Sequence, residues 1–254
     1  MKKETFDKML EILEADYQKK HLQGGRPPKL SVLDKLIIML EYYKEYWVME
    51  CIAFDYGARK STICDATHWV EETLIKSGQF HLPSKRELWR NPELEAVLLD
   101  ATEREIERPE KKQRQYYSGK KRHTLKTQII ADEKSLDIIC VFFGSGKTHD
   151  FQLYKNSKTH ISEKVESVQD KGYQGLGKLH ANSTIPVKAS KNYSLTKAEK
   201  KLNREISKRR IYIEHINRYI KRFRILSYRY RNKRKRFGLR VSLICGIYNF
   251  QHVS

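Results

Sequence analysis

The stretch Ala96-Val97-Leu98-Leu99-Asp100 separates two kinds of sequence pattern. Its four apolar residues predict a short buried strand, and the aspartate marks the end of that strand. A carboxylate that follows a strand of an α/β domain lies at the sheet edge where ligands bind. An ordinary turn or N-cap aspartate would give the same local sequence. The strand alone therefore leaves both interpretations of Asp100 open.

The residues after this stretch alternate between strand and helix patterns. Strands are predicted at 123–131 and 136–143, with a turn between them, and more weakly at 165–170 and 185–189. Helices are predicted at 150–158, 196–223 and 239–250, and residues 108–120 are expected to form a loop. Thr196 with Glu199 three residues later predicts a capping box for the longest helix. This order of elements predicts an α/β domain over residues 95–254.

The residues before the stretch have helical spacing, which predicts an all-α region over 1–90. Ser31 with Asp34 is a capping box for a helix expected to reach Trp47. A short helix, Gly57 and a second helix over 60–76 then give the pattern of a DNA-binding helix-turn-helix, although a plain helical hairpin has the same pattern. Residues 24–28 break the chain, and Arg26-Pro27 within them is weak evidence for a minor-groove arm.

The charge of the chain is concentrated near its end. Lys and Arg total 51 against 31 Asp and Glu, a net charge of +20. Residues 1–100 hold 15 basic and 17 acidic side chains (net −2), residues 101–196 hold 18 and 11 (net +7), and residues 197–254 hold 18 and 3 (net +15). This asymmetry predicts a polyanionic partner such as nucleic acid.

The composition also excludes several classes of protein. With 39% hydrophobic residues the chain can form real cores, so global disorder is not expected. No apolar run approaches the roughly 20 residues that span a bilayer, and no secretory signal is recognisable. The four cysteines have no metal-binding spacing. We expect reduced, buried thiols in a cytoplasmic protein.

Two further carboxylates have unusual surroundings. Asp170 ends a predicted strand and precedes Lys-Gly-Tyr-Gln-Gly, a sequence typical of a tight turn. Glu214 is one of three acids among eighteen cations after residue 196, and Arg210 and Lys221 share its side of the helix. A solvated helix face with ion pairs worth about 0.2–0.5 kcal/mol each would also explain Glu214.

The three acids gain meaning as a set. Two aspartates at strand ends and a glutamate on a later helix can converge over one sheet edge. Carboxylate oxygens of this kind suit Mg²⁺ or Mn²⁺. Two such ions about 3.5–4 Å apart would activate an attacking hydroxyl and stabilise the leaving oxygen of a phosphodiester.

Several blocks of sequence then resemble a known family in the same order. They are Asp-Ala-Thr-Glu-Arg-Glu-Ile-Glu-Arg-Pro at 100–109, Tyr-Ser-Gly-Lys-Lys-Arg-His-Thr-Leu-Lys-Thr-Gln at 117–128, Gly-Lys-Thr-His-Asp at 146–150, Asp-Lys-Gly-Tyr-Gln-Gly at 170–175, the block at 214–226 and Ile-Tyr-Asn at 247–249. Together they resemble the DDE transposases of bacterial insertion sequences, the "IS five" family. The helix-turn-helix pattern fits the same family more loosely.

The resemblance implies an RNase H-like mixed sheet flanked by helices, preceded by the all-α region. It implies that Asp100, Asp170 and Glu214 are catalytic residues that bind two Mg²⁺ or Mn²⁺ ions. The expected contacts to the DNA backbone are Arg210 and Lys221, with Arg218, Arg222, Arg59 and Lys60 as further candidates and the run from Arg229 to Arg240 as a basic surface. His149 and Asp150 are expected near the site, without an assigned role.

The implied function is that of a DNA transposase. It would bind the terminal inverted repeats of an element, cleave the ends and join the freed 3′-hydroxyl to target DNA. Joining two ends implies a homodimer or higher oligomer on double-stranded DNA, in the bacterial cytoplasm and associated with the nucleoid. Two alternatives are a non-catalytic DNA-binding regulator derived from a transposase, and an RNase H-like nuclease that cuts without joining.

Overall fold

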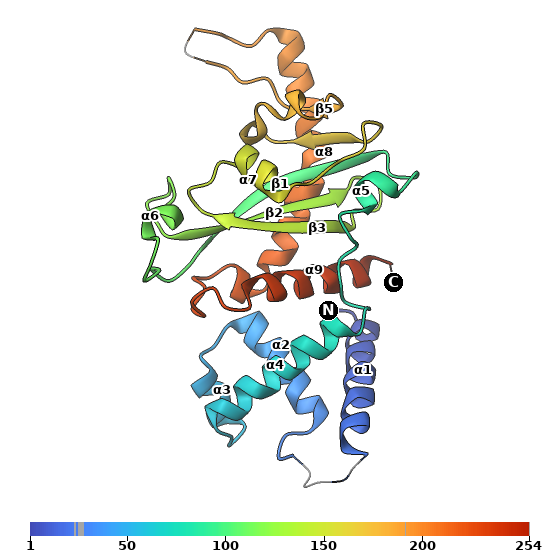
Figure 1. The fold of residues 1–254 in the computed structure, drawn as a ribbon, viewed down its shortest axis with the longest axis vertical. Coiled ribbons are helices and arrows are strands. Elements are labelled where there is room, and N and C mark those ends of the chain that lie inside the picture. The colour runs from blue at the N-terminus through green and yellow to red at the C-terminus, as the bar shows by residue number, and fades with distance from the viewer. Residues whose placement is uncertain (23, 25–27, 191, 254) are drawn as a thin grey trace. The chain divides into compact units, whose positions relative to one another are not determined.

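The computed structural model describes residues 1–22, 24, 28–190 and 192–253. The chain forms two compact units, which are drawn in Figure 1. The first unit combines Met1–His81 with Ile220–Ser254, and the second comprises Leu82–Tyr219. Gly25, Arg26 and Pro27, which include the suggested minor-groove arm, lie outside the described residues. No described helix is long and apolar enough to cross a bilayer.

The first unit is helical. Its elements are α1 (Lys3–His21), α2 (Val32–Glu45), α3 (Met49–Asp55), α4 (Lys60–Lys76), the 3-10 helix η3 (Arg224–Leu226) and α9 (Phe237–Val253). Its core contains fully buried side chains from α1, α2, α4 and α9, including Leu13, Leu36, Val70 and Leu243. The last helix is therefore part of the same core as the N-terminal helices.

The helix-turn-helix geometry follows the predicted pattern. Helix α3 ends at Asp55, Gly57 takes a left-handed conformation (φ +54°) that favours glycine, and α4 begins at Lys60 as expected. The capping box at Ser31 is confirmed, because the Asp34 amide donates to the Ser31 side chain and the Ser31 amide donates to Asp34. Helix α2 ends at Glu45, slightly before the predicted end, because Tyr46 turns the chain with φ 55°.

The second unit is built on a mixed sheet, as the resemblance implied. Its strands are β1 (Ala96–Glu105), β2 (Thr124–Asp132), β3 (Ile138–Ser145), β4 (Glu166–Gln169) and β5 (Ser183–Thr184). They lie in the order β3-β2-β1-β4-β5. The hairpin neighbours β1, β2 and β3 are antiparallel, whereas β1 pairs with β4, and β4 with β5, in parallel.

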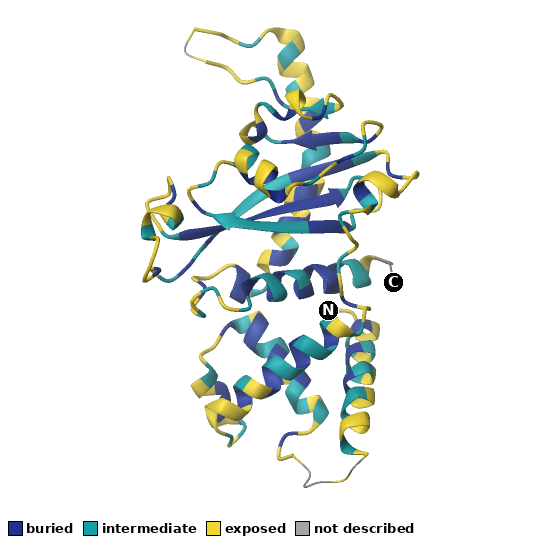
Figure 2. Ribbon diagram, in the orientation of Figure 1, coloured by how far each residue is buried: buried dark blue, intermediate teal, exposed yellow. Residues whose placement is uncertain are grey.

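Helices lie on both faces of this sheet (Figure 1). The helices of this unit are α5 (Glu87–Arg90), α6 (Gln113–Tyr116), α7 (Asp150–Ser157) and α8 (Lys197–Lys221), with 3-10 helices η1 (Lys171–Tyr173) and η2 (Leu176–Lys178). Figure 1 shows α7 on one face and α8 on the other. Figure 2 shows buried residues along the strands of this sheet. The predicted capping box of α8 is confirmed, since the Glu199 amide donates to the Thr196 hydroxyl.

Some local predictions are wrong. Residues 185–189 form no strand, because β4 pairs instead with the two residues of β5 just before them. The predicted loop 108–120 contains the short helix α6. Among the cysteines, Cys140 and Cys245 are buried as expected, but Cys51 is exposed and Cys64 is only half-buried; all are free thiols.

Candidate active site

The register of the sheet brings Asp100 and Asp170 together. In the parallel pair of β1 and β4, the last partners are Leu99 and Gln169. Asp100 and Asp170 are the next residue of each strand, so the two carboxylates start from neighbouring backbone positions. Because adjacent strands are about 4.8 Å apart, the two acids lie close together on the sheet, although they come from distant parts of the chain.

The prediction that Asp100 ends its strand is wrong. Strand β1 continues to Glu105, because β2 remains paired with it and Asp100 lies opposite Ile129. What ends at this point is β4. The Asp170 side chain accepts a hydrogen bond of 2.7 Å from the Gly172 amide and so caps the 3-10 helix that follows. At Asp100, β1 therefore has no strand partner, within the described part of the chain, on the side where β4 has ended.

Helix α8 completes the surroundings of Asp100. The side-chain amide of Asn217 donates to Asp100 Oδ2 over 2.7 Å. The Arg210 guanidinium is 3.6 Å from the other oxygen of Asp100 and 4.0 Å from Glu214 Oε1. Glu214 is thus linked to Asp100 through Arg210, and its side chain is 56% exposed. The structure places all three predicted acids in the second unit, with Glu214 as the outermost one.

The electrostatic state of Asp100 is unusual. Burial raises the pKa of its carboxyl to about 6, against the effect of Arg210 and of the Ala101 amide, which lower it. The neighbouring charges of Asp170 and Asp150 raise the pKa further. Neighbouring negative charges make ionisation of a carboxyl less favourable, and a bound cation removes this penalty.

Asp150 belongs to this acidic group. It is the first residue of α7, its carboxylate receives a hydrogen bond of 2.7 Å from Lys126, and Lys126 lies 3.7 Å from Glu103. A Cβ on Gly172 would come within 2.4 Å of the Asp150 carboxylate, so glycine is needed there for the close approach. His149 is the N-cap of α7 and is exposed, with no side-chain capping bond. The sequence predicted that both residues lie near the site, but it did not predict their contacts.

The donor set at this point fits a hard divalent cation. Carboxylate and amide oxygens supply it, and Asn217 Oδ1 is buried without a hydrogen-bond partner in the described part of the chain. Among the described residues, no three carboxylates, histidines or cysteines are already gathered as a closed metal cage. An open set of oxygens is what Mg²⁺ accepts, since it keeps several of its waters.

The predicted basic residues have different surroundings. Arg210 is largely buried against the acids, whereas Arg218 of the same helix is exposed. Lys221 and Arg222 are exposed and belong to the first unit. So do Arg59, which is the exposed N-cap of α4, and Lys60, which pairs with Glu50.

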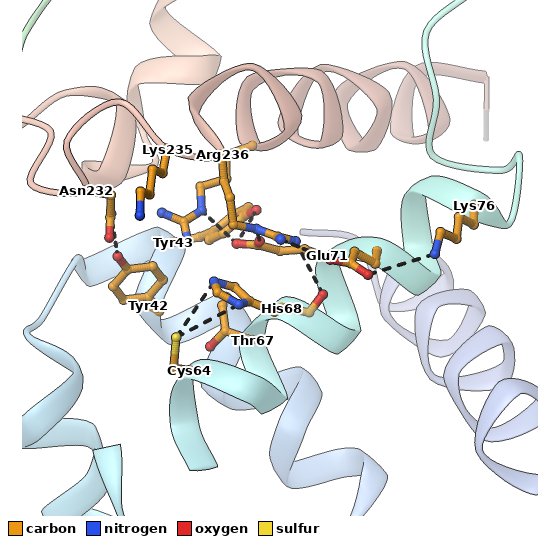
Figure 3. A network of polar contacts seen from close by, with 12 residues as sticks. Tyr42, Tyr43, Cys64, Thr67, His68, Glu71, Lys76, Asn232, Lys235 and Arg236 are labelled. Atoms are coloured by element: carbon orange, nitrogen blue, oxygen red, sulfur yellow. Dashed lines mark hydrogen bonds and ion pairs between the residues drawn. The ribbon is translucent and has the colours of Figure 1, made fainter. Parts of the chain in front are cut away.

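The run from Arg229 to Arg240 does not form one basic surface, and this prediction is wrong at two positions. Arg236 turns inward to Glu71 of α4 (Figure 3), and Arg240 also pairs with Glu71, which is fully buried. Arg236 Nε donates to Glu71 over 2.6 Å, and Arg240 Nε donates to it over 2.7 Å. The Tyr43 hydroxyl also donates to Glu71.

This Glu71 network ties α4 to α2 and α9. Arg240 is 1% exposed and also donates to the Tyr230 hydroxyl over 3.0 Å. Although burial lowers it, the pKa of Arg240 is raised because Glu71 lies beside it. The second helix of the helix-turn-helix is thus held by the last helix of the chain. Arg229, Arg231, Lys233 and Lys235 are the exposed cations of the same run.

Comparisons with known proteins match two segments of the chain to the same superfamily. Residues 99–249 match the family described as DDE superfamily endonuclease, and residues 28–80 match the helix-turn-helix of DDE superfamily endonuclease. The chain is 43% identical, over 98% of its length and 91% of the relative, to the probable transposase for insertion sequence element IS702 of Microchaete diplosiphon. No solved structure matches the chain.

Proposed function

Because the chain belongs to the DDE superfamily of endonucleases, we propose that it is a DNA transposase of the "IS five" type whose catalytic residues are Asp100, Asp170 and Glu214. It binds the terminal inverted repeats of its element, cleaves them and joins the 3′-hydroxyl to target DNA. The observation that carries this proposal is the register of β1 and β4, which sets Asp100 and Asp170 side by side under Asn217 and Arg210 of α8.

Each of these residues has a distinct task in the proposal. Asp100 and Asp170 hold divalent cations, and Glu214 completes the set from α8. When bound, a pair of Mg²⁺ or Mn²⁺ ions supplies activation of the attacking hydroxyl and stabilisation of the leaving oxygen. Asn217 orients Asp100 through its hydrogen bond, and Arg210 balances the negative charge of the site until a cation and a phosphate arrive.

DNA binding is divided between the two units in this proposal. The helix-turn-helix, with Arg59 and Lys60 at the start of α4, reads the ends of the element, and the exposed cations Arg218, Lys221 and Arg222 contact phosphates. Binding that depends on such contacts weakens steeply with salt. Two ends are brought together by a homodimer or a higher oligomer, in the cytoplasm at the nucleoid.

A cleavage and joining assay tests the proposal. Labelled duplexes that carry the DNA flanking the reading frame are incubated with the protein, Mg²⁺ and a supercoiled target plasmid, and both cut ends and joined products are measured. Asp100→Asn, Asp170→Asn and Glu214→Gln should abolish both products. Glu205→Gln is the matched control, because Glu205 also lies on α8 and, among the residues that the structure describes, its carboxylate pairs only with Lys208 on the exposed surface.

The alternatives give different outcomes in the same assay. If the wild-type protein binds the ends but never cuts them, the regulator hypothesis replaces the proposal. If it cuts without joining, the nuclease hypothesis does. If Asp100→Asn cuts as fast as the wild type, the assignment of the catalytic residues is wrong.

A further inference from the structure

A pocket that the candidate active site does not use lies between the β1–β2 connection and the loop after β3. Its volume is about 530 Å³, within the range that holds small organic ligands. It lies entirely in the second unit. Its lining consists of Arg108, Gln113, Arg114, Tyr117, His123 and Lys147.

Backbone contacts hold the lining residues in place. Tyr117 and His123 form an isolated antiparallel bridge, and their rings meet edge to face with centroids 5.4 Å apart. The Tyr117 amide donates to Gln113, and the Lys147 amide donates to Gln115 over 3.2 Å. The end of β3 is thereby fixed to α6, so the pocket does not depend on a ligand for its shape.

The pocket is cationic. Arg108, Arg114 and Lys147 line it, and among the described residues no carboxylate does. In the part of the chain that the structure describes, none of these three side chains forms an ion pair; Arg108 Nε instead donates over 2.9 Å to Gln113, which fixes the direction of its guanidinium. Guanidinium groups held in this way match the geometry of phosphate oxygens.

The pocket also presents an aromatic surface. The Tyr117 side chain is 48% exposed although its neighbour His123 fixes the ring from one edge. An exposed, positioned aromatic ring beside unpaired cations is the combination that binds a base and its phosphate together. Neither a purely anionic ligand nor an apolar one would use both halves of this lining.

We propose that this pocket binds one nucleotide, with its base stacked on Tyr117 and its phosphate held by Arg108, Arg114 and Lys147. The proposal rests on the proposed function for the source of the nucleotide, an unpaired residue of the DNA on which the active site acts. Strand β1 connects the two places, because Asp100 lies within it and the pocket begins just after its end at Glu105.

The spacing fits one DNA strand. Five residue steps of β-strand from Asp100 to Glu105 span roughly 17 Å. That distance equals about five nucleotide steps along one strand of duplex DNA. A nucleotide in the pocket therefore lies a few positions from the phosphate at the active site, where an unpaired base near a cut end would be found.

Binding measured without chemistry tests this assignment. Fluorescence anisotropy is recorded with the full chain in EDTA, using a blunt duplex and the same duplex with a single-stranded extension. The extension should strengthen binding to the wild type. Tyr117→Ala should remove that gain, a loss of roughly 5- to 100-fold in affinity for the extended probe, and leave the blunt duplex unchanged. The double variant Arg108→Ala with Arg114→Ala should also lose it.

Matched variants separate stacking from misfolding. Tyr117→Phe keeps the ring and should bind as the wild type does. Trp89→Ala removes another exposed aromatic side chain of the same unit and should change nothing. If Tyr117→Ala keeps the preference for the extension, or if Tyr117→Phe loses it as Tyr117→Ala does, the stacking role is overturned.

A competition experiment identifies the source of the nucleotide. Excess deoxyadenosine monophosphate that abolishes the preference for the extension, while blunt-duplex binding persists, assigns the pocket to free nucleotides as well. No competition assigns it to DNA alone. Failure of Asp100→Asn to affect cleavage would remove the proposed function but not this result, since the binding assay contains no metal and no reaction.

Discussion

Two carboxylates, the buried Glu71 of α4 and the half-buried Asp100 of β1, have opposite surroundings. Glu71 is fully buried and receives hydrogen bonds from Arg236, Arg240 and Tyr43. Asp100 keeps a 19% exposed side chain, one hydrogen bond from Asn217 and a more distant Arg210. Burial and two other aspartates raise the pKa of Asp100 to about 6.

This difference separates the structural role of Glu71 from the catalytic role proposed for Asp100. A carboxylate whose charge is fully balanced by its neighbours has no oxygen lone pairs or charge left for a ligand. A carboxylate whose charge is not balanced and that lies beside other carboxylates lowers the stability of the fold. Such a loss of stability is expected at a site where function requires a bound cation. The two residues can therefore be distinguished by experiments in which one loses activity and the other loses stability.

The largest effect is expected for Asp100→Asn. Cleavage in Mg²⁺ should fall by roughly 10³-fold or more, because an amide replaces the charge of a proposed metal ligand. The midpoint of thermal unfolding should stay the same or rise, since the repulsion with Asp170 and Asp150 is removed. Single-turnover cleavage and thermal denaturation measure the two quantities. A variant that is inactive because it is unfolded would contradict this prediction.

The converse is expected for Glu71→Gln. Replacing this carboxylate leaves Arg236 and Arg240 without their buried partner, which should lower the free energy of unfolding by about 3–5 kcal/mol. Urea denaturation measures the loss, and hydrogen exchange of α4 and α9 locates it. Glu72→Gln is the control, because Glu72 also contacts Arg236 but its side chain is 46% exposed. An equal loss in the control would show that burial is not the cause.

The sequence predicted the local part of this contrast but not the long-range part. The bounds of α4 followed from apolar spacing and Gly57, and Glu214 was found because an acid is rare among so many cations. The inward direction of Arg236 and Arg240 could not be predicted, because their partner Glu71 lies 165 and 169 positions away in the chain. A run of basic residues has the same composition whether it faces solvent or a buried acid.

The register of the strands was a second long-range feature. Asp100 was expected to end a strand because the apolar run stops at Leu99, yet β1 continues through polar residues that pair with β2. The pairing of β1 with β4, which sets Asp170 beside Asp100, joins segments separated by about 70 positions and has no local signal. The three acids were grouped because two follow predicted strands and one lies on a later helix, and the resemblance of sequence blocks added their catalytic assignment.

A combined substitution sharpens the structural half of the comparison. Glu71→Leu with Arg236→Met and Arg240→Met removes the buried charges together instead of leaving one side unpaired. Replacement of a whole buried ion pair by apolar groups is often neutral, so this variant should regain most of the stability that Glu71→Gln loses. Urea denaturation of the two variants tests this. Equal destabilisation of both would mean that the charges themselves contribute net stability.

The smallest effect concerns a third arrangement of carboxylates, midway between the other two. Arg209 of α8 binds Glu133, at the turn after β2, and Glu166, at the start of β4. Hydrogen bonds from Arg209 lower the pKa of Glu166, against the effect of partial burial, and Thr184 adds to the lowering. A depressed pKa in the folded state means that this group stabilises the protein above its ordinary value of 4.5, and that the contribution is lost as the pH falls through the folded value.

Glu166→Gln should therefore flatten the stability profile on the acid side. Above pH 4.5 the variant should be slightly less stable than the wild type, and the two should converge at lower pH, where the wild-type carboxyl is protonated as well. Thermal unfolding midpoints across this range measure the convergence, with Glu205→Gln as a control on the exposed side of α8. A constant difference at every pH would assign the effect to lost packing. Convergence would place Glu166 between the other two carboxylates, because its charge is balanced, like that of Glu71, and its side chain is accessible to solvent, like that of Asp100.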